Sequence, residues 1–202
     1  MEKSVIRRYS NGRSIHDIAA ETGCTEKKIR YILIKNGVKR RTHSEALYLK
    51  ANPDGDPFKL IKKMTPEEDH LKALALGLYL TEGCLKHQHS VRFSNSNPGI
   101  VKIFVKFLRI ICGVPQDKIK ASLIVYPDVD VEKAKDYWSK FLDLPVAQFS
   151  KTTVLGSRTT AGSLKRHSEI GTATVYVHNS KLLGIIKDWV KEYSYVAQIV
   201  ER

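Results

Sequence analysis

The sequence predicts an α+β fold preceded by a small all-α unit, and three observations lead to this prediction. Residues 1–50 are strongly basic and contain short helical patterns. A turn-rich stretch with Pro53, Gly55 and Pro57 then interrupts any helical pattern. Beyond it, segments of alternating hydrophobicity recur between segments with helical spacing. We therefore expect a small domain at residues 1–50, a linker at residues 51–64 and an α+β domain at residues 65–202.

The first domain has the caps and the turn of a pair of short helices. An upstream helix is expected over residues 4–10, and Ser14 can cap a second helix. Gly23 can turn the chain before Thr25 caps a third helix, whose apolar positions recur at helical spacing. Two short helices around a glycine turn, followed by a basic segment, predict a helix-turn-helix.

Caps and periodicity also predict the elements of the second domain. Thr65, Pro66 and Glu68 form a capping-box pattern, so a helix should begin at Pro66. It should end at Gly83, because glycine can adopt the positive φ that ends many helices. The elements expected after it are a strand at 91–95, a helix from 98 to about 111, a strand at 119–126, a helix at 131–142, strands at 148–155 and 172–178, and a helix at 181–193.

The charge of the chain points to a polyanionic partner. Its 34 Lys and Arg against 21 Asp and Glu give a net charge of +13 and a pI of about 9.6, with +7 in residues 1–50. Such an excess attracts nucleic acid and releases its counterions. The longest apolar stretch, residues 73–80, is too short to span a bilayer, and three unrelated cysteines make no disulfide framework. We expect a soluble, cytoplasmic protein without membrane contact.

The run from Ser14 to Arg30 resembles resolvase-type helix-turn-helix modules, and the resemblance covers about residues 3–41. It implies that the helix after Thr25 enters the major groove of duplex DNA. The residues implied to contact bases or phosphates are Thr25, Lys27, Lys28, Arg30 and Tyr31, and those implied to follow the backbone are Lys39, Arg40 and Arg41. The alternative is a helical hairpin whose charges are only solvated.

The helical run from Ala75 to Gly83 is apolar on nearly every face until Glu82. Such a helix must be buried on two sides, one of which can be a second protein surface. Gly77 removes a side chain where two helix backbones would approach each other. A carboxylate at the negative end of a helix is unfavourable unless a positive group such as a metal ion lies beside it.

This run resembles the signature helix of LAGLIDADG homing endonucleases, with Gly77, Glu82 and Gly83 at the third, eighth and ninth positions of that motif. Leu80 stands at the sixth position, where the family name has aspartate. The resemblance covers about residues 65–195 and implies an αββαββα core with a saddle-shaped mixed or antiparallel sheet. Because the chain has one signature run, it also implies a homodimer on a partly palindromic duplex DNA site.

The resemblance assigns roles to particular residues. Glu82 becomes the catalytic acid that binds Mg²⁺ or Mn²⁺, and Lys151 is the nominated catalytic lysine, with Lys86 as its rival. The implied dimer interface contains Leu76, Gly77, Leu80 and Gly83. Apart from the resemblance, Arg92 alternates with apolar neighbours on a strand and can face either a DNA groove or water. Arg158, Lys165 and Arg166 lie in a loop that can either bind phosphates or be an exposed hairpin tip.

The functional hypothesis is therefore a homodimeric LAGLIDADG-type homing endonuclease that binds a specific DNA sequence and hydrolyses its phosphodiester bonds. The first alternative is a transcription regulator with the same fold and no catalysis. A further alternative is an RNA-binding or splicing-assisting protein. No zinc site is expected, because Cys84, His87 and His89 lack a fourth ligand and have an uncommon spacing.

Overall fold

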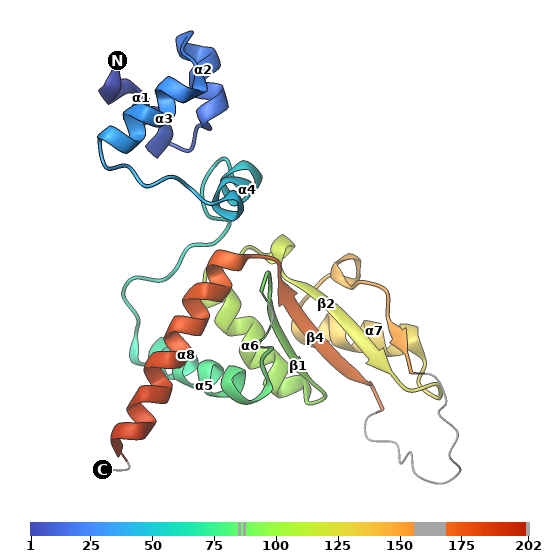
Figure 1. The fold of residues 1–202 in the computed structure, drawn as a ribbon. Coiled ribbons are helices and arrows are strands. Elements are labelled where there is room, and N and C mark those ends of the chain that lie inside the picture. Colours follow the sequence, from blue (N-terminus) through green and yellow to red (C-terminus); the bar gives the residue numbers. More distant parts are fainter. Residues whose placement is uncertain (85, 87, 156–168, 201–202) are drawn as a thin grey trace. The chain divides into compact units, whose positions relative to one another are not determined.

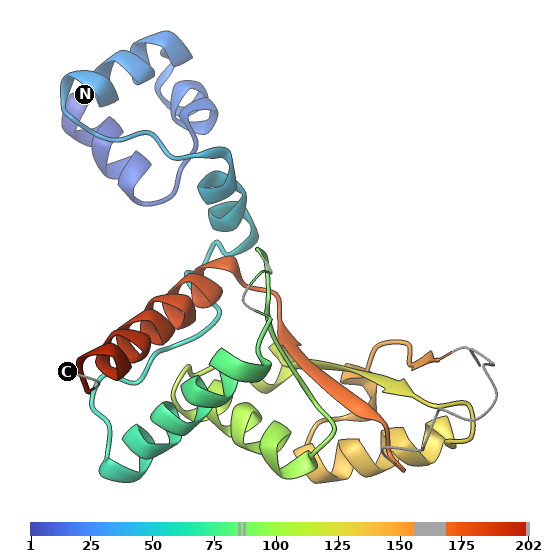
Figure 2. The ribbon, with the colours of Figure 1, turned by 60° about the horizontal axis from the view of Figure 1, so that its bottom comes forward.

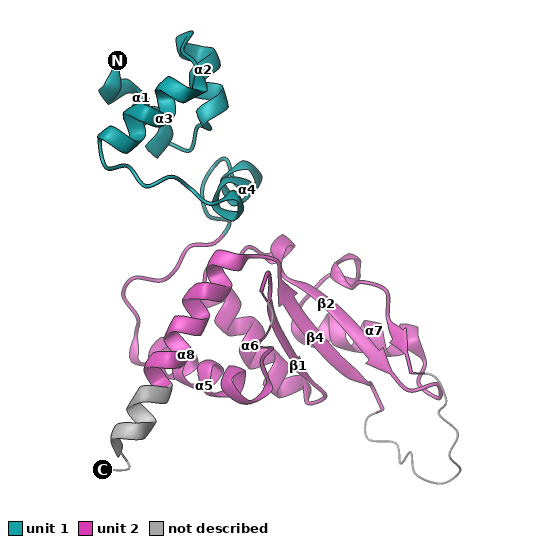
Figure 3. Cartoon of the chain, viewed as in Figure 1, with its two compact units in different colours: residues 1–57 teal, residues 58–202 magenta. Residues whose placement is uncertain are grey.

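The computed structural model describes residues 1–84, 86, 88–155 and 169–200, and the side chains of 194–200 are outside the description. The chain is an α+β protein in which N-terminal helices precede a mixed four-stranded sheet interleaved with helices (Figure 1). It divides into two compact units, residues 1–57 and residues 58–202 (Figure 3). No helix in the described ranges is long and apolar enough to cross a membrane.

Unit 1, residues 1–57, contains the helices α1 (Glu2–Ser10), α2 (Ile15–Thr22), α3 (Glu26–Lys35) and α4 (His43–Ala51). The caps of α2 and α3 are those expected from the sequence. Ser14 Oγ accepts a hydrogen bond from the Asp17 N–H at 3.0 Å, and Thr25 Oγ1 accepts one from the Lys28 N–H at 3.3 Å. Gly23 ends α2 with φ 65°, the left-handed conformation that glycine adopts without strain.

Helices α1, α2 and α3 enclose one small apolar core. Its buried members are Val5, Tyr9, Ile18, Ala19, Ile29, Ile32 and Leu33. Helix α4 was not expected, although Thr42 and Glu45 form a capping box at its start. This helix has no buried residue, and its sequence lacks the apolar stripe from which an amphipathic helix is usually predicted.

Unit 2, residues 58–202, is built around the sheet. Its helices are α5 (Pro66–Glu82), α6 (Pro98–Ile110), α7 (Val131–Leu142) and α8 (Ser180–Val200), with short 3₁₀ turns at Gln116–Lys118 and Val146–Gln148. Its strands are β1 (Val91–Asn95), β2 (Lys120–Val125), β3 (Thr153–Val154) and β4 (Thr172–Val177). The strand order is β1-β4-β2-β3, with antiparallel β1–β4 and β2–β4 pairs and a parallel β2–β3 pair.

Helices α6 and α7 lie along one face of this sheet (Figure 2). Alternate residues of β1, β2 and β4 are buried on that face, as the period of two in a strand requires. Aromatic rings join α5 to the sheet through α6, because Phe104 stacks on Tyr79 at 5.3 Å and on Phe93 at 4.5 Å between ring centroids. One continuous core therefore fixes α5 against β1.

Two local predictions for unit 2 were wrong. The strand expected at 148–155 is only Thr153–Val154, because Pro145 precedes a 3₁₀ turn and the buried Gln148 donates a hydrogen bond to the Gln116 carbonyl at 2.9 Å. Gly83 ends α5 with φ −79°, which is not a positive φ. Glycine is needed there because a Cβ atom would clash with the Tyr79 carbonyl and ring.

Part of the expected linker at 51–64 is packed onto unit 2. The Lys59 N–H donates to the Gly113 carbonyl at 3.2 Å, and the Ile61 N–H donates to the Ile111 carbonyl at 3.0 Å. The side chains of Phe58, Leu60 and Ile61 pack against the core. Gly113 has φ +58°, and a Cβ atom there would clash with the Lys59 backbone, so glycine permits this contact.

Candidate nucleic-acid interface

The outer face of α3 lies opposite the side that packs into unit 1. Ile29, Ile32 and Leu33 point into the core, while Lys27 and Lys28 are exposed. Neither lysine side chain has an ion-pair partner among the residues that the structure describes. The two lysines are therefore free to contact a polyanion.

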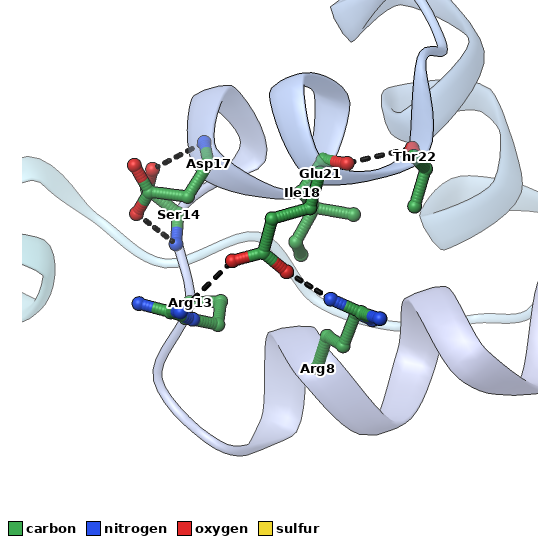
Figure 4. A network of polar contacts seen from close by, with 7 residues as sticks. All are labelled: Arg8, Arg13, Ser14, Asp17, Ile18, Glu21 and Thr22. Atoms are coloured by element: carbon green, nitrogen blue, oxygen red, sulfur yellow. Dashed lines mark hydrogen bonds and ion pairs between the residues drawn. The ribbon is translucent and has the colours of Figure 1, made fainter.

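Other cations of unit 1 are already neutralised by acids. Glu21 on α2 pairs with Arg8 on α1, and its second oxygen pairs with Arg13 at 2.9 Å (Figure 4). Arg30 pairs with Glu26 at 2.7 Å, one turn away on α3. Lys35 pairs with Glu2 at 3.0 Å. These exposed pairs contribute little to stability, but they reduce the charge that these side chains offer to phosphate.

The three cations in the segment between α3 and α4 have different contacts. Lys39 and Arg40 are exposed and have no ion pair within the described ranges. Arg41 is held against the unit instead: its guanidinium carbon lies 4.0 Å from the Tyr9 ring centroid, and Nη1 donates to the Gly12 and Arg13 carbonyls at 3.1 and 3.2 Å. Its N–H also donates to the Tyr9 hydroxyl at 2.8 Å. We therefore interpret Arg41 as an anchor of this segment.

In unit 2, the sheet face opposite α6 and α7 carries polar and basic side chains. The register places Tyr176 on β4 between Arg92 on β1 and Lys120 on β2, and the Arg92 guanidinium carbon lies 5.0 Å from the Tyr176 ring centroid. The next row contains Ser94, Thr174 and Ser122, with 2.7 Å between the first two hydroxyl oxygens. These positions contain no acid, so this face is positively charged.

The outward residues of α5 form an apolar stripe. Leu74 is 52% exposed, Leu80 is 45% exposed, and Gly77 lies between them on the same side of the helix. A Cβ atom added at Gly77 would meet nothing within 4 Å, so contacts inside the described protomer do not explain this glycine. Leu76 is buried in the core at 1% exposure and is not available to a partner. Gly83 contacts Tyr79 of its own protomer.

Glu82 lies at the end of α5, where the chain reaches the free edge of β1. Gly83 forms an isolated bridge with Phe93, and the Cys84 N–H donates to the Arg92 carbonyl at 3.1 Å. The Glu82 side chain is exposed and has no hydrogen-bond or ion-pair partner in the described part of the chain. It is thus free to accept an external ligand.

A buried tyrosine lies directly behind this turn. The Tyr79 hydroxyl makes no hydrogen bond of normal geometry to the described residues, although the Arg92 backbone is close to it. Burial raises the pKa of Tyr79 to about 12, so the phenol stays protonated at neutral pH.

The two nominated lysines have different placements. Lys151 lies just before β3, and the N–H of the preceding residue, Ser150, donates to the Ala121 carbonyl on β2. Strands β1, β4 and β2 therefore lie between Lys151 and Glu82, and one protomer does not bring these two side chains together. Lys86 is exposed and only four residues beyond Glu82. Arg158, Lys165 and Arg166 lie outside the described residues.

The donors for a metal ion are few in one protomer. Among the described residues, no three His, Cys, Asp or Glu side chains come together. At the end of α5, Glu82 offers a hard, exposed carboxylate oxygen of the kind that Mg²⁺ accepts. Mg²⁺ sites often contain only one or two carboxylates beside phosphate oxygens and water. Glu82 therefore fits the role of one ligand in a site completed by other groups.

Sequence reasoning missed the half-buried Lys120 and Tyr176 on the sheet face, and it also missed the exposed side chains of Leu74 on α5 and Ile34 on α3. The signal for Lys120 and Tyr176 was present, since each occupies an alternate position in a strand whose other positions are apolar. Leu74 is one turn before Gly77 on α5.

Comparison of the chain with family models, curated proteins and solved structures finds no match.

Proposed function

We propose that this chain is a sequence-specific, homodimeric DNA-binding protein of the LAGLIDADG type that hydrolyses phosphodiester bonds of duplex DNA with Mg²⁺ or Mn²⁺. The observation that carries the DNA-binding part is the placement of cations that have no ion-pair partner among the described residues. Lys27 and Lys28 lie on the outer face of α3, and Arg92 and Lys120 lie on a sheet face without acids. In this proposal α2 and α3 form a helix-turn-helix whose second helix enters the major groove.

The α5 stripe supports the proposed dimer. Leu74 and Leu80 expose apolar surface on either side of Gly77, whose missing side chain leaves room for close approach of a second backbone. Glycine in the middle of a helix destabilises it by about 0.5–1 kcal/mol relative to alanine. Close packing of two α5 helices from different protomers would offset the destabilisation that Gly77 causes.

Glu82 supports the catalytic part, because its carboxylate is exposed at the end of the proposed interface helix and has no partner among the described residues. Two copies would each supply one Glu82, and phosphate oxygens would complete the ligand set. A bound Mg²⁺ neutralises phosphate charge and favours ionisation of a coordinated water. Lys86 is the lysine nearest to Glu82 in sequence, and it can stabilise the added negative charge on the phosphate.

One observation favours a second candidate, a transcription regulator with the same dimer and no cleavage. A single protomer gathers no group of three potential metal ligands within the described residues. Fold likeness does not decide between a nuclease and a regulator. The two functions predict the same DNA binding and differ only in the fate of the DNA.

Binding is tested by measuring the affinity of the full chain for duplex DNA at several salt concentrations. Each phosphate contact that is lost should reduce the slope of log K against log salt by about 0.9. We expect that reduction for Lys27→Ala and Arg40→Ala. Lys133→Ala is the control, because Lys133 is an exposed lysine on α7, which lies along the opposite sheet face from Arg92 and Lys120 (Figure 2). Equal slopes for all variants would refute the assigned DNA-binding surface.

Cleavage is tested on supercoiled plasmid that carries a site selected from a randomised duplex library. We expect linear product with Mg²⁺ for the wild-type protein and for Glu132→Gln, a matched change of an exposed acid on α7. Glu82→Gln should bind the site and leave the plasmid intact. Binding without cleavage by the wild-type protein would favour the regulator.

A further inference from the structure

Helix α3 carries two large apolar side chains where a solvated helix would carry polar ones. Tyr31 is 63% exposed and Ile34 is 66% exposed. With 3.6 residues per turn, Lys27, Tyr31 and Ile34 fall on one line along the helix, at the spacing i, i+4 and i+7. That line is opposite Ile29 and Leu33, which pack into the core. The outer face is thus apolar along its centre.

Cations lie at one end of this apolar line and along one side of it. Lys28 and Lys27 are unpaired within the described part of the chain, and Lys35 lies on the same side of the helix in an ion pair with Glu2. A ligand that fits must present apolar groups beside negatively charged groups. In the major groove of duplex DNA, thymine is the base that presents an apolar group, its C5 methyl, and phosphates border the groove.

We infer that α3 reads thymine methyl groups, with Ile34 and the Tyr31 ring as the specificity-determining side chains. This inference rests on the proposed DNA binding and adds the chemistry of the target to it. Lys27 and Lys28 place the helix through phosphate contacts, which carry no sequence information. The apolar line then favours half-sites that contain thymine at the contacted positions.

The test compares thymine with deoxyuridine, which lacks only the C5 methyl. A duplex site is first selected from a randomised library with the full chain, and each thymine is then replaced by deoxyuridine in turn. Burying one CH₂-sized group contributes about 0.8 kcal/mol, so each contacted methyl that is removed should weaken binding about fourfold. We expect that loss at one or two thymines of each half-site.

Two variants make the assignment to α3 specific. At the thymine that Ile34 contacts, Ile34→Ala should bind the thymine and deoxyuridine duplexes with nearly equal affinity, because its side chain no longer reaches the methyl group. Leu47→Ala is the control, since Leu47 is 53% exposed on α4 and lies outside the α3 face. It should keep the fourfold discrimination of the wild-type protein.

The outcomes distinguish failure of this inference from failure of the proposed DNA-binding function. Tight, salt-dependent binding with equal affinity for thymine and deoxyuridine would overturn the inference and leave DNA binding intact. The same discrimination in wild-type protein and Ile34→Ala would overturn the role of Ile34. No enrichment of any duplex, with binding that is independent of salt, would refute the DNA-binding function itself.

Discussion

Replacing Gly77 by alanine should have opposite effects on the protomer and on the dimer. Gly77 is in the interior of α5, and an added Cβ atom would meet nothing within 4 Å. The protomer therefore gains helix propensity without a clash, and its free energy of unfolding should rise by about 0.5–1 kcal/mol. In a dimer through α5, the same methyl enters the contact from both copies, and overpacking of that kind costs about 1–3 kcal/mol.

Two measurements on the same samples test this prediction. Both tryptophans, Trp138 and Trp189, lie in unit 2, so their fluorescence follows the unfolding of that unit in urea. At protein concentrations where the monomer predominates, the urea midpoint should rise by roughly 0.4 M. Sedimentation at higher concentrations should show a dimer dissociation constant about 5 to 150 times larger than for the wild-type protein.

Gly184 on α8 provides the matched control. A Cβ atom there also meets nothing within 4 Å, and the residue is also inside a helix. Gly184→Ala should therefore stabilise unit 2 to a similar extent and leave the dimer dissociation constant unchanged. The reasoning is refuted if both variants stabilise the protomer equally and both keep the wild-type dimer, because Gly77 would then lie outside any interface.

Three further outcomes are expected. Arg41→Ala removes two carbonyl hydrogen bonds and the contact with the Tyr9 ring, so amide exchange in α1–α3 should become roughly 5–30 times faster, while the salt dependence of DNA binding stays unchanged. Gly83→Ala should destabilise unit 2 in urea by about 1–3 kcal/mol, because its Cβ atom would clash with Tyr79. The pKa of Tyr79 is raised to about 12 in the folded protein, above the usual value near 10. The contribution of the neutral Tyr79 phenol to stability is therefore complete below pH 10 and is lost as the pH rises through 12. In Tyr79→Phe, the free energy of unfolding should decline less steeply at alkaline pH.

Much of the secondary structure could be predicted because local signals coincide with local contacts. The capping box at Thr65 begins α5, and the boundaries of β1 and α7 agree with the sequence pattern. Helix α4 was not predicted because its cap is not followed by an apolar stripe. The strand expected at 148–155 failed for a different reason, since burial of Gln148 beside Gln116 is a tertiary contact that alternation does not encode.

The candidate interface was less predictable than the fold. The sequence indicates which residues are basic, but it does not indicate which of them meet an acid far along the chain. Arg8 and Glu21 are 13 residues apart, and Arg41 reaches carbonyls near residue 12. Lys120 and Tyr176 join Arg92 only through the strand register. Such placements depend on the order of strands and helices in space, so periodicity alone cannot supply them.

The two edges of the sheet are poor templates for adding another strand. At one edge β3 is only two residues long, and at the other the bridge between Gly83 and Phe93 already occupies part of β1. Short or covered edges protect proteins from uncontrolled aggregation through backbone hydrogen bonds. Copies of this protein that meet in a crowded solution are thereby directed away from fibril-like stacking and toward contacts between side chains.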